Sequence, residues 1–146
     1  MKVKSLIILV LISIYGCSNG LLNGSGYQMR KKNLEVVEKI KHSHFGECPD
    51  ATIEEVLSAV AEYTEWHGSF LEENAANCRV MLRYIDPVTL ESKYLWLSIF
   101  FLYSDNKVRI RSIFEEQSNR WYKDEIGIKF VMDGIYSSYR TITGCK

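Results

Sequence analysis

The sequence predicts an α+β fold in which an antiparallel sheet of about four strands packs against one or two helices. One segment has the complete pattern of a helix N-terminus, and the segments after it alternate apolar with polar residues. Such alternation is typical of strands that bury one face. Turn-forming residues separate the alternating segments, which favours hairpin connections between neighbouring strands.

Two segments before the strands show helical spacing of apolar residues. Residues 28–43 place Leu34, Val37 and Ile40 at this spacing, which is compatible with a short helix or an edge strand. Further on, Thr52 and Glu55 form a capping box, and an apolar stripe follows it. The stripe predicts a helix over about residues 52–65 and consists of Ile53, Val56, Leu57, Val60 and Ala61.

Four strands are predicted after this helix, at residues 66–72, 78–85, 92–104 and 107–116. Asp86-Pro87 opens the turn between the second and third strands, and Asp105-Asn106 forms a two-residue turn between the third and fourth. The closing stretch, residues 119–139, predicts a last helix. Its apolar side chains near helical spacing are Trp121, Ile128, Val131, Ile135 and Tyr139.

Alternation assigns the strand residues to two faces of the sheet. With the turn at Asp105-Asn106, Tyr103 is expected opposite Val108 and Leu102 opposite Arg109. We expect one face to form the core beneath the capped helix. Its predicted members are Val80, Leu82, Tyr84, Leu95, Leu97, Ile99, Phe101, Tyr103, Val108, Ile110 and Phe114.

The opposite face is predicted to carry arginine and large apolar side chains, where a solvated face carries threonine, lysine, glutamate and serine. Because arginine and aromatic residues are enriched where proteins bind one another, we expect a protein partner here. The alternative is that the N-terminal segment or the closing helix covers the face. We also expect Arg111 to lie opposite Phe100 and to form a cation–π pair. The partner-binding residues are predicted to be Arg79, Arg83, Tyr94, Trp96, Phe100, Arg109 and Arg111, and the face also holds Met81, Leu102 and Ile113.

The first residues have the features of an export signal. Lys2 and Lys4 supply positive charge, and the apolar run over residues 6–14 has about half the length of a membrane-spanning helix. The stretch Ile14-Tyr15-Gly16-Cys17 resembles the lipobox of bacterial lipoprotein precursors, in which a small residue precedes an invariant cysteine. Tyr15 stands where the motif usually has a smaller residue.

This resemblance implies an address and an anchor. It implies a signal peptide over residues 1–16 and a Cys17 that carries diacylglycerol on its sulfur and an acyl chain, such as palmitate, on its amino group. At about 0.8 kcal/mol per buried methylene, several chains make attachment to the membrane effectively permanent. Ser18 after the cysteine implies the outer membrane of a Gram-negative cell envelope, facing the periplasm. The alternative is an ordinary signal peptide with a chance cysteine.

The composition of residues 18–27, rich in glycine, asparagine and serine, indicates a flexible tether, so we expect a lipidated tether over residues 17–28 and one domain over residues 29–146. Three stretches of this domain resemble landmarks of small exported bacterial domains without an assigned activity. They are Val37 to Lys41, Thr52 to Leu57, and Trp66 to Phe70, the last one residue wider than the pattern. This resemblance implies an α+β fold and no catalytic residue.

Cys48, Cys78 and Cys145 remain as disulfide candidates once Cys17 is lipidated, because an exported protein meets oxidising conditions. We expect Cys48 to pair with Cys78, since each flanks a predicted element. Cys145 is an alternative partner for either of them, and three unpaired thiols are the remaining alternative.

The charges and motifs disfavour several functions. The chain has 18 basic and 18 acidic residues, so it has no net field to attract nucleic acid. No nucleophile motif or phosphate-binding loop is present, and His42, His44 and His67 lack the spacing of a familiar metal site, so we expect no catalysis, metal or other cofactor. We expect recognition or inhibition of a protein at the membrane surface. The alternatives are a structural accessory subunit of an envelope or secretion assembly, or a small envelope hydrolase.

Overall fold

The computed structural model describes residues 25–45, 48–72, 75–105 and 107–145. The chain divides into two compact units, residues 1–32 and 33–146, and the second unit contains the sheet and its core. The predicted signal peptide, Cys17 and residues 18–24 of the predicted tether lie outside the described residues. Helix α2 (Ser25–Lys41) begins inside the range expected to be tether.

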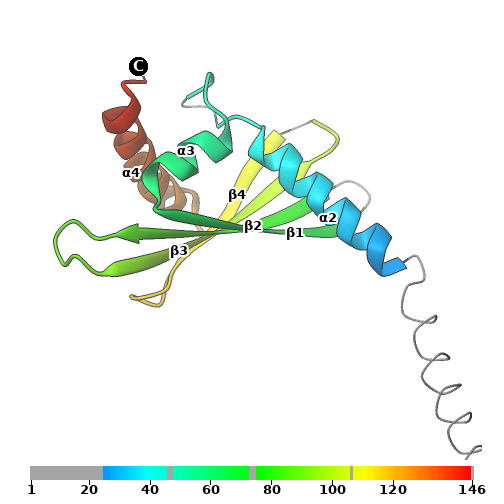
Figure 1. Ribbon diagram of the computed structural model, residues 1–146, viewed down its shortest axis with the longest axis horizontal. Coiled ribbons are helices and arrows are strands. Elements are labelled where there is room, and N and C mark those ends of the chain that lie inside the picture. Colours follow the sequence, from blue (N-terminus) through cyan, green and yellow to red (C-terminus); the bar gives the residue numbers. More distant parts are fainter. Residues whose placement is uncertain (1–24, 46–47, 73–74, 106, 146) are drawn as a thin grey trace, which may run out of the picture. The chain divides into compact units, whose positions relative to one another are not determined.

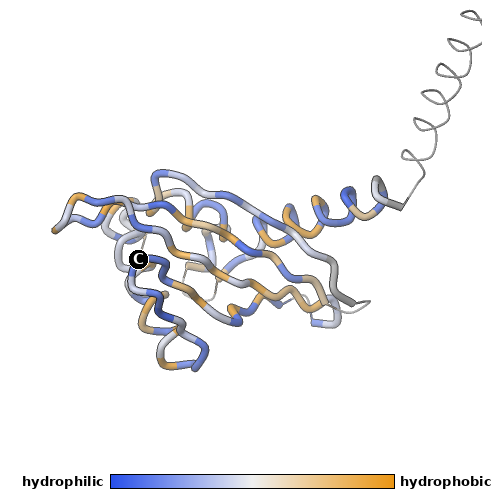
Figure 2. The backbone as a smooth tube through the Cα atoms, turned by 90° about the horizontal axis from the view of Figure 1, so that it is seen from below, coloured by the Kyte–Doolittle hydropathy of each residue, from blue (hydrophilic) through white to orange (hydrophobic). Residues whose placement is uncertain are grey.

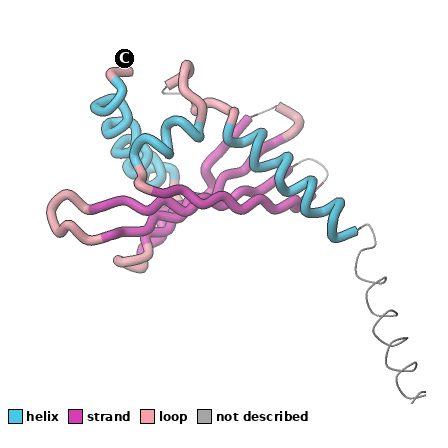
Figure 3. The backbone as a smooth tube through the Cα atoms, in the orientation of Figure 1, coloured by secondary structure: helices cyan, strands magenta, loops and turns pink. Residues whose placement is uncertain are grey.

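The fold is α+β, as the sequence predicts, with five strands in place of about four. The antiparallel sheet has the order β1-β2-β3-β4-β5, so every neighbouring pair is also consecutive in the chain. Helices α3, α4 and the part of α2 from Asn33 onward lie on one side of this sheet (Figures 1 and 3). The bounds are α3 (Ile53–Val60), β1 (Tyr63–Glu72), β2 (Ala75–Ile85), β3 (Ser92–Leu102), β4 (Lys107–Glu115), β5 (Arg120–Tyr122) and α4 (Glu125–Thr143).

The capping box at the start of α3 is confirmed. The Thr52 side chain accepts a hydrogen bond from the Glu55 backbone N–H, and the Thr52 N–H donates to the Glu55 carboxylate at 2.7 Å. The helix ends at Val60, however, and the prediction that it continues to about residue 65 is wrong. Aromatic and β-branched residues follow from Tyr63 onward, and they pair with β2 because they favour an extended backbone.

The stretch 28–43, left open between helix and edge strand, is helical as far as Lys41, where α2 ends. Val36, Val37 and Ile40 on one side of this helix are buried in the core. Gly68 of β1 permits the close approach, because a Cβ there would lie 2.4 Å from the backbone oxygen of Asn33 and 2.7 Å from Cγ2 of Val37. A glycine in the first predicted strand therefore serves the packing of a helix on that strand.

The register between β3 and β4 differs from the predicted one in two ways. Leu102 lies opposite Lys107, and Arg109 opposite Phe100, because the connection after β3 is longer than the predicted two-residue turn. This two-residue shift leaves every side chain on its predicted face. A bulge then follows, since Ile110 pairs with Ile99 but Ser112 pairs with Ser98, which leaves Arg111 as the extra residue in β4.

The bulge reverses the predicted faces of the residues that follow it. Ile113, expected on the outer face, is fully buried, and it pairs with the fully buried Leu97. Phe114, expected in the core, pairs with Trp96 on the outer face and is half-buried. The rest of the predicted core face is confirmed: Val80, Leu82, Leu95, Leu97, Ile99 and Phe101 are buried, and Tyr84, Tyr103, Val108 and Ile110 pack against them.

The closing stretch contains a strand as well as the predicted helix. Trp121, expected on the helix, belongs to the three-residue strand β5 and pairs with Phe114. Helix α4 begins after Asp124, whose carboxylate accepts a hydrogen bond from the Gly127 N–H at 2.8 Å. Its Met132, Ile135, Tyr136 and Tyr139 side chains are buried in the core.

Alanine substitutions at two adjacent positions test the bulge. Ile113→Ala removes a side chain with no exposed surface and is expected to lower the free energy of unfolding by about 2–5 kcal/mol. Phe114→Ala removes a half-buried ring stacked on Trp121, and is expected to cost about 2 kcal/mol or less. Guanidinium unfolding of both variants shows which substitution lowers the free energy of unfolding more. A larger decrease for Phe114→Ala than for Ile113→Ala would contradict the register.

Candidate functional site

The helices leave one face of the sheet uncovered within the described part of the chain. We call this the outer face; along each strand, hydrophobic and hydrophilic positions mix (Figure 2). The buried residues of α2, α3 and α4 all belong to the core on the opposite face, so the closing helix does not cover the outer face. The outer face includes Glu65, His67, Arg79, Met81, Arg83, Tyr94, Trp96, Ser98, Phe100, Arg109, Arg111, Ser112, Phe114 and Trp121.

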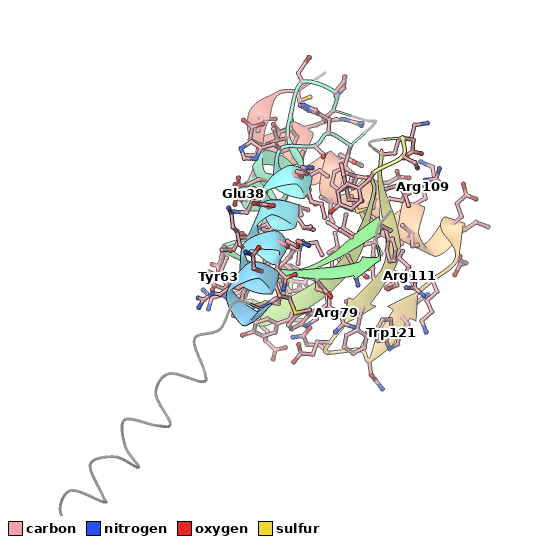
Figure 4. The ribbon with its side chains drawn as sticks, turned by 90° about the vertical axis from the view of Figure 1, so that its right-hand side faces the viewer. Glu38, Tyr63, Arg79, Arg109, Arg111 and Trp121 are labelled. Carbon is pink, nitrogen blue, oxygen red and sulfur yellow. The ribbon has the colours of Figure 1, made fainter. Side chains whose placement is uncertain are left out.

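A hollow lies at the centre of the outer face. It measures about 320 Å³, and a second hollow of about 450 Å³ adjoins it. Arg79, Ser98, Ser112 and Trp121 line both hollows, and Arg79, Arg111 and Trp121 come from three different strands (Figure 4). The first hollow is completed by Trp96, Leu97 and Phe114, and the second by Asn77, Arg111 and Lys123.

Three aromatic rings in one cross-strand row form the floor of the first hollow. The register places Trp96, Phe114 and Trp121 next to one another on β3, β4 and β5. The Phe114 and Trp121 rings stack with centroids 4.6 Å apart. Trp96 is fixed by its indole N–H, which donates to the Glu116 carboxylate at 3.0 Å. The row exists because the bulge turns Phe114 outward.

Cationic side chains lie over two aromatic rings of the outer face, those of Phe100 and Trp121. The Arg111 guanidinium lies over the Phe100 ring, 5.4 Å from its centroid, which confirms the predicted cation–π contact even though the two residues are not paired in the register. The Lys123 ammonium lies 4.9 Å from the centroid of Trp121. Among the described residues, Arg79 and Arg111 have no carboxylate partner, and both are exposed. The hollow therefore combines unneutralised positive charge with apolar surface.

The remaining predicted binding residues lie outside the hollow. Arg83 and Tyr94 pair with each other at one end of β2 and β3, and Arg83 lies near the Glu62 carboxylate at 3.7 Å. Arg109 lies toward the turn after β3, with its guanidinium 3.9 Å from the Asp105 carboxylate. The seven predicted residues thus share one face, but only Arg79, Trp96 and Arg111 line the hollows.

Sequence reasoning missed Phe114, Trp121 and Lys123 as members of the site. Phe114 was assigned to the core by strict alternation, which a bulge interrupts. Trp121 was assigned to a helix because its spacing to later apolar residues is helical. The alternation Arg120-Trp121-Tyr122-Lys123, directly after the turn-prone Gln117-Ser118-Asn119, was the available signal for a short strand.

The cysteines are arranged differently from the expected pairing. Cys78 lies on the core face of β2, and its thiol donates to the Arg79 carbonyl at 3.8 Å. The Cys48 sulfur lies 3.3 Å from that of Cys145, so the contact in this structure is that of the alternative pairing and not of the expected Cys48–Cys78 pair. The contact with the Cys48 thiol and burial together raise the pKa of Cys145.

The three histidines make separate contacts. His42 and His44 each bond through Nδ1 to a backbone carbonyl, those of Glu38 and Ala51, at 2.7 and 3.0 Å. His67 lies on β1, with Nε2 3.0 Å from the Glu65 carboxylate. In the part of the chain that the structure describes, no group of three or more metal-binding side chains comes together.

Comparison with protein-family models, with curated proteins and with solved structures found no match. None of the described helices has the length and hydrophobicity to cross a membrane. Guanidinium and ammonium groups beside exposed rings can bind carboxylates while the rings bury apolar surface, as at protein–protein interfaces.

Proposed function

We propose that this protein is a lipid-anchored component of a bacterial cell envelope that binds a protein partner without catalysis. The partner is held on the outer face, around the two adjoining hollows whose linings include Arg79, Trp96, Arg111 and Trp121. Its contact surface presents carboxylates together with apolar side chains. The single observation that supports this proposal most is the unneutralised pair Arg79 and Arg111 beside a row of rings that no described helix covers.

Residue types and exposure support a partner-binding role for this face. Tryptophan and arginine are the residues that most often contribute large binding energies at the centres of interfaces. Trp121 is 53% exposed. Contact of its large apolar ring with water is unfavourable in free energy. Burial of this ring and of its neighbours against a partner would supply affinity, and the two guanidiniums would select for acidic groups.

The anchor rests on the N-terminal sequence. The charged start, the short apolar run and Gly16-Cys17 together match the processing and lipidation pattern of lipoprotein precursors. Lipid attachment would restrict the protein to a surface and raise its effective concentration toward partners in the same envelope. Weak contacts through a hollow of this size would then be sufficient for function.

Replacement of Cys17 tests the anchor. When the full chain is produced in a bacterial host, we expect to recover it in the membrane fraction. Its mass is expected to be that of a chain that begins at Cys17 and carries diacylglycerol and an amide-linked acyl group. Cys17→Ser is expected to abolish the lipid mass and release the protein from that fraction, because the acceptor sulfur is gone. Cys145→Ser is the matched control and is expected to stay with the membrane. An unacylated chain beginning at Met1 would contradict the proposal.

Charge reversal in the hollow tests partner binding. Arg79→Glu combined with Arg111→Glu replaces attraction of carboxylates with repulsion, and is expected to reduce retention of an envelope partner at least about tenfold. Lys129→Glu is the control, because Lys129 is an exposed residue of α4 whose ion pair with Asp133 contributes little to stability. The measurement is quantitative crosslinking and recovery from envelopes of the native host, with circular dichroism to verify folding.

Three results distinguish this proposal from its competitors. Retention that falls with the double variant and with rising salt, but not with Lys129→Glu, supports recognition through the hollow. Equal retention by all three proteins would contradict it. A partner that cannot be removed without unfolding the chain would indicate instead the structural-subunit alternative.

A further inference from the structure

Two cysteines that are far apart in sequence meet at one end of the core. Cys48 lies in the loop between α2 and α3 with no exposed surface, and Cys145 follows α4. Their sulfur atoms are 3.3 Å apart although 97 positions separate the residues. In this structure the contact is a hydrogen bond in which the Cys145 thiol donates to the Cys48 sulfur.

The loop that carries Cys48 is held in place by several contacts. His44 and Thr52 form an isolated β-bridge across the loop, and the Ile53 N–H donates to the Ser43 carbonyl at 2.8 Å. Phe45 extends from the same loop to α4, where its ring meets that of Tyr136 edge-on at 5.9 Å. The approach of Cys48 to the end of α4 is therefore supported by packing of the whole loop and does not depend on the two sulfur atoms alone.

The chain after α4 is also directed toward Cys48. Gly144 has a φ of 72°, a left-handed conformation that ends the helix, and its N–H donates to the Arg140 carbonyl at 2.8 Å. This turn carries Cys145 back toward the core, where its N–H bonds to the Thr143 hydroxyl at 3.3 Å. Both sulfurs thus sit on backbone whose conformation is fixed locally.

The third cysteine is a poor competitor for either sulfur. Cys78 has no exposed surface on the core face of β2, and burial raises the pKa of its thiol to about 12. Its thiol bonds to the Arg79 carbonyl at 3.8 Å, whereas the sulfurs of Cys48 and Cys145 are already in contact with each other.

From this geometry we propose that Cys48 and Cys145 form a disulfide bond that fastens the C-terminal end of α4 to the loop before α3. In the reaction, one thiolate attacks a sulfur of a small or protein disulfide and releases one thiol of the oxidant, which leaves a mixed disulfide. The second thiolate then attacks the protein sulfur of this mixed disulfide and releases the other thiol. One S–S bond forms in this protein and one breaks in the oxidant, which leaves as two thiols. The pairing does not rest on the proposed function, although an envelope compartment would supply such an oxidant.

Peptide mapping of the purified full chain tests the pairing. The reduced chain is incubated with oxidised glutathione, its free thiols are alkylated, and it is digested without reductant. Trypsin alone would leave Cys48 and Cys78 in one peptide, residues 42–79, so a glutamate-specific protease is added to separate them. We expect Cys48 to be recovered in covalent linkage to the C-terminal peptide, residues 141–146, and Cys78 to be alkylated only after unfolding. A bridge that joins either cysteine to any other thiol, or two free thiols after oxidation, would overturn the proposal.

Thermal unfolding supplies a second measurement that does not depend on peptide recovery. A bond that closes a loop of about 100 residues is expected to raise Tm by on the order of 10 °C, and dithiothreitol is expected to remove the rise. Cys145→Ser changes a partly exposed residue, so it is expected to fold, to unfold at the reduced Tm and to show no response to oxidant. Cys78→Ser is the matched control and is expected to keep the oxidant-dependent rise. A rise that persists in Cys145→Ser would overturn the pairing.

Discussion

One extra residue in β4 determines which side chains of the last two strands are buried. Arg111 has no partner in β3, and beyond it the alternation of β4 is reversed. Ile113 therefore completes a buried row with Val80 and Leu97, which runs on to the buried Tyr122 of β5. The same shift turns Phe114 outward beside Trp96. The burial of Ile113 and the outward position of Phe114 are thus two consequences of a single irregularity in one strand.

The hollow follows from this arrangement together with the one-sided packing of the helices. The buried positions of α2, α3 and α4 all serve the core face, and none of these helices has a buried side chain left for the outer face. Rings from β3, β4 and β5 then form an apolar floor, and Arg79, Arg111 and Lys123 supply positive charge around it. Bulges redirect the side chains of a strand, and the bulged Arg111 lies over the Phe100 ring on the outer face.

Local signals in the sequence predicted much of the fold. The capping box located the start of α3, and alternation assigned most residues of β2 and β3 to the correct face. These patterns depend on neighbours a few residues away, which is why one sequence reveals them. The bulge, the strand β5 and the approach of Cys48 to Cys145 depend on contacts between distant segments, and no local pattern encodes them. Consequently Arg79, Trp96 and Arg111 were predicted as site residues, whereas Phe114, Trp121 and Lys123 were not.

The outer face is open in the folded protein, and the three tryptophans allow its exposure to be measured directly. Trp66 packs against the core with its indole nitrogen buried, whereas Trp96 and Trp121 lie on the outer face. Nuclear magnetic resonance of the indole N–H groups of the full chain, with a soluble gadolinium chelate added, compares their exposure. An open outer face predicts strong broadening of the indole N–H signal of Trp121, less for that of Trp96 and least for that of Trp66. Protection of Trp121 equal to that of Trp66 would contradict it, because another segment or copy of the chain would then cover the hollow.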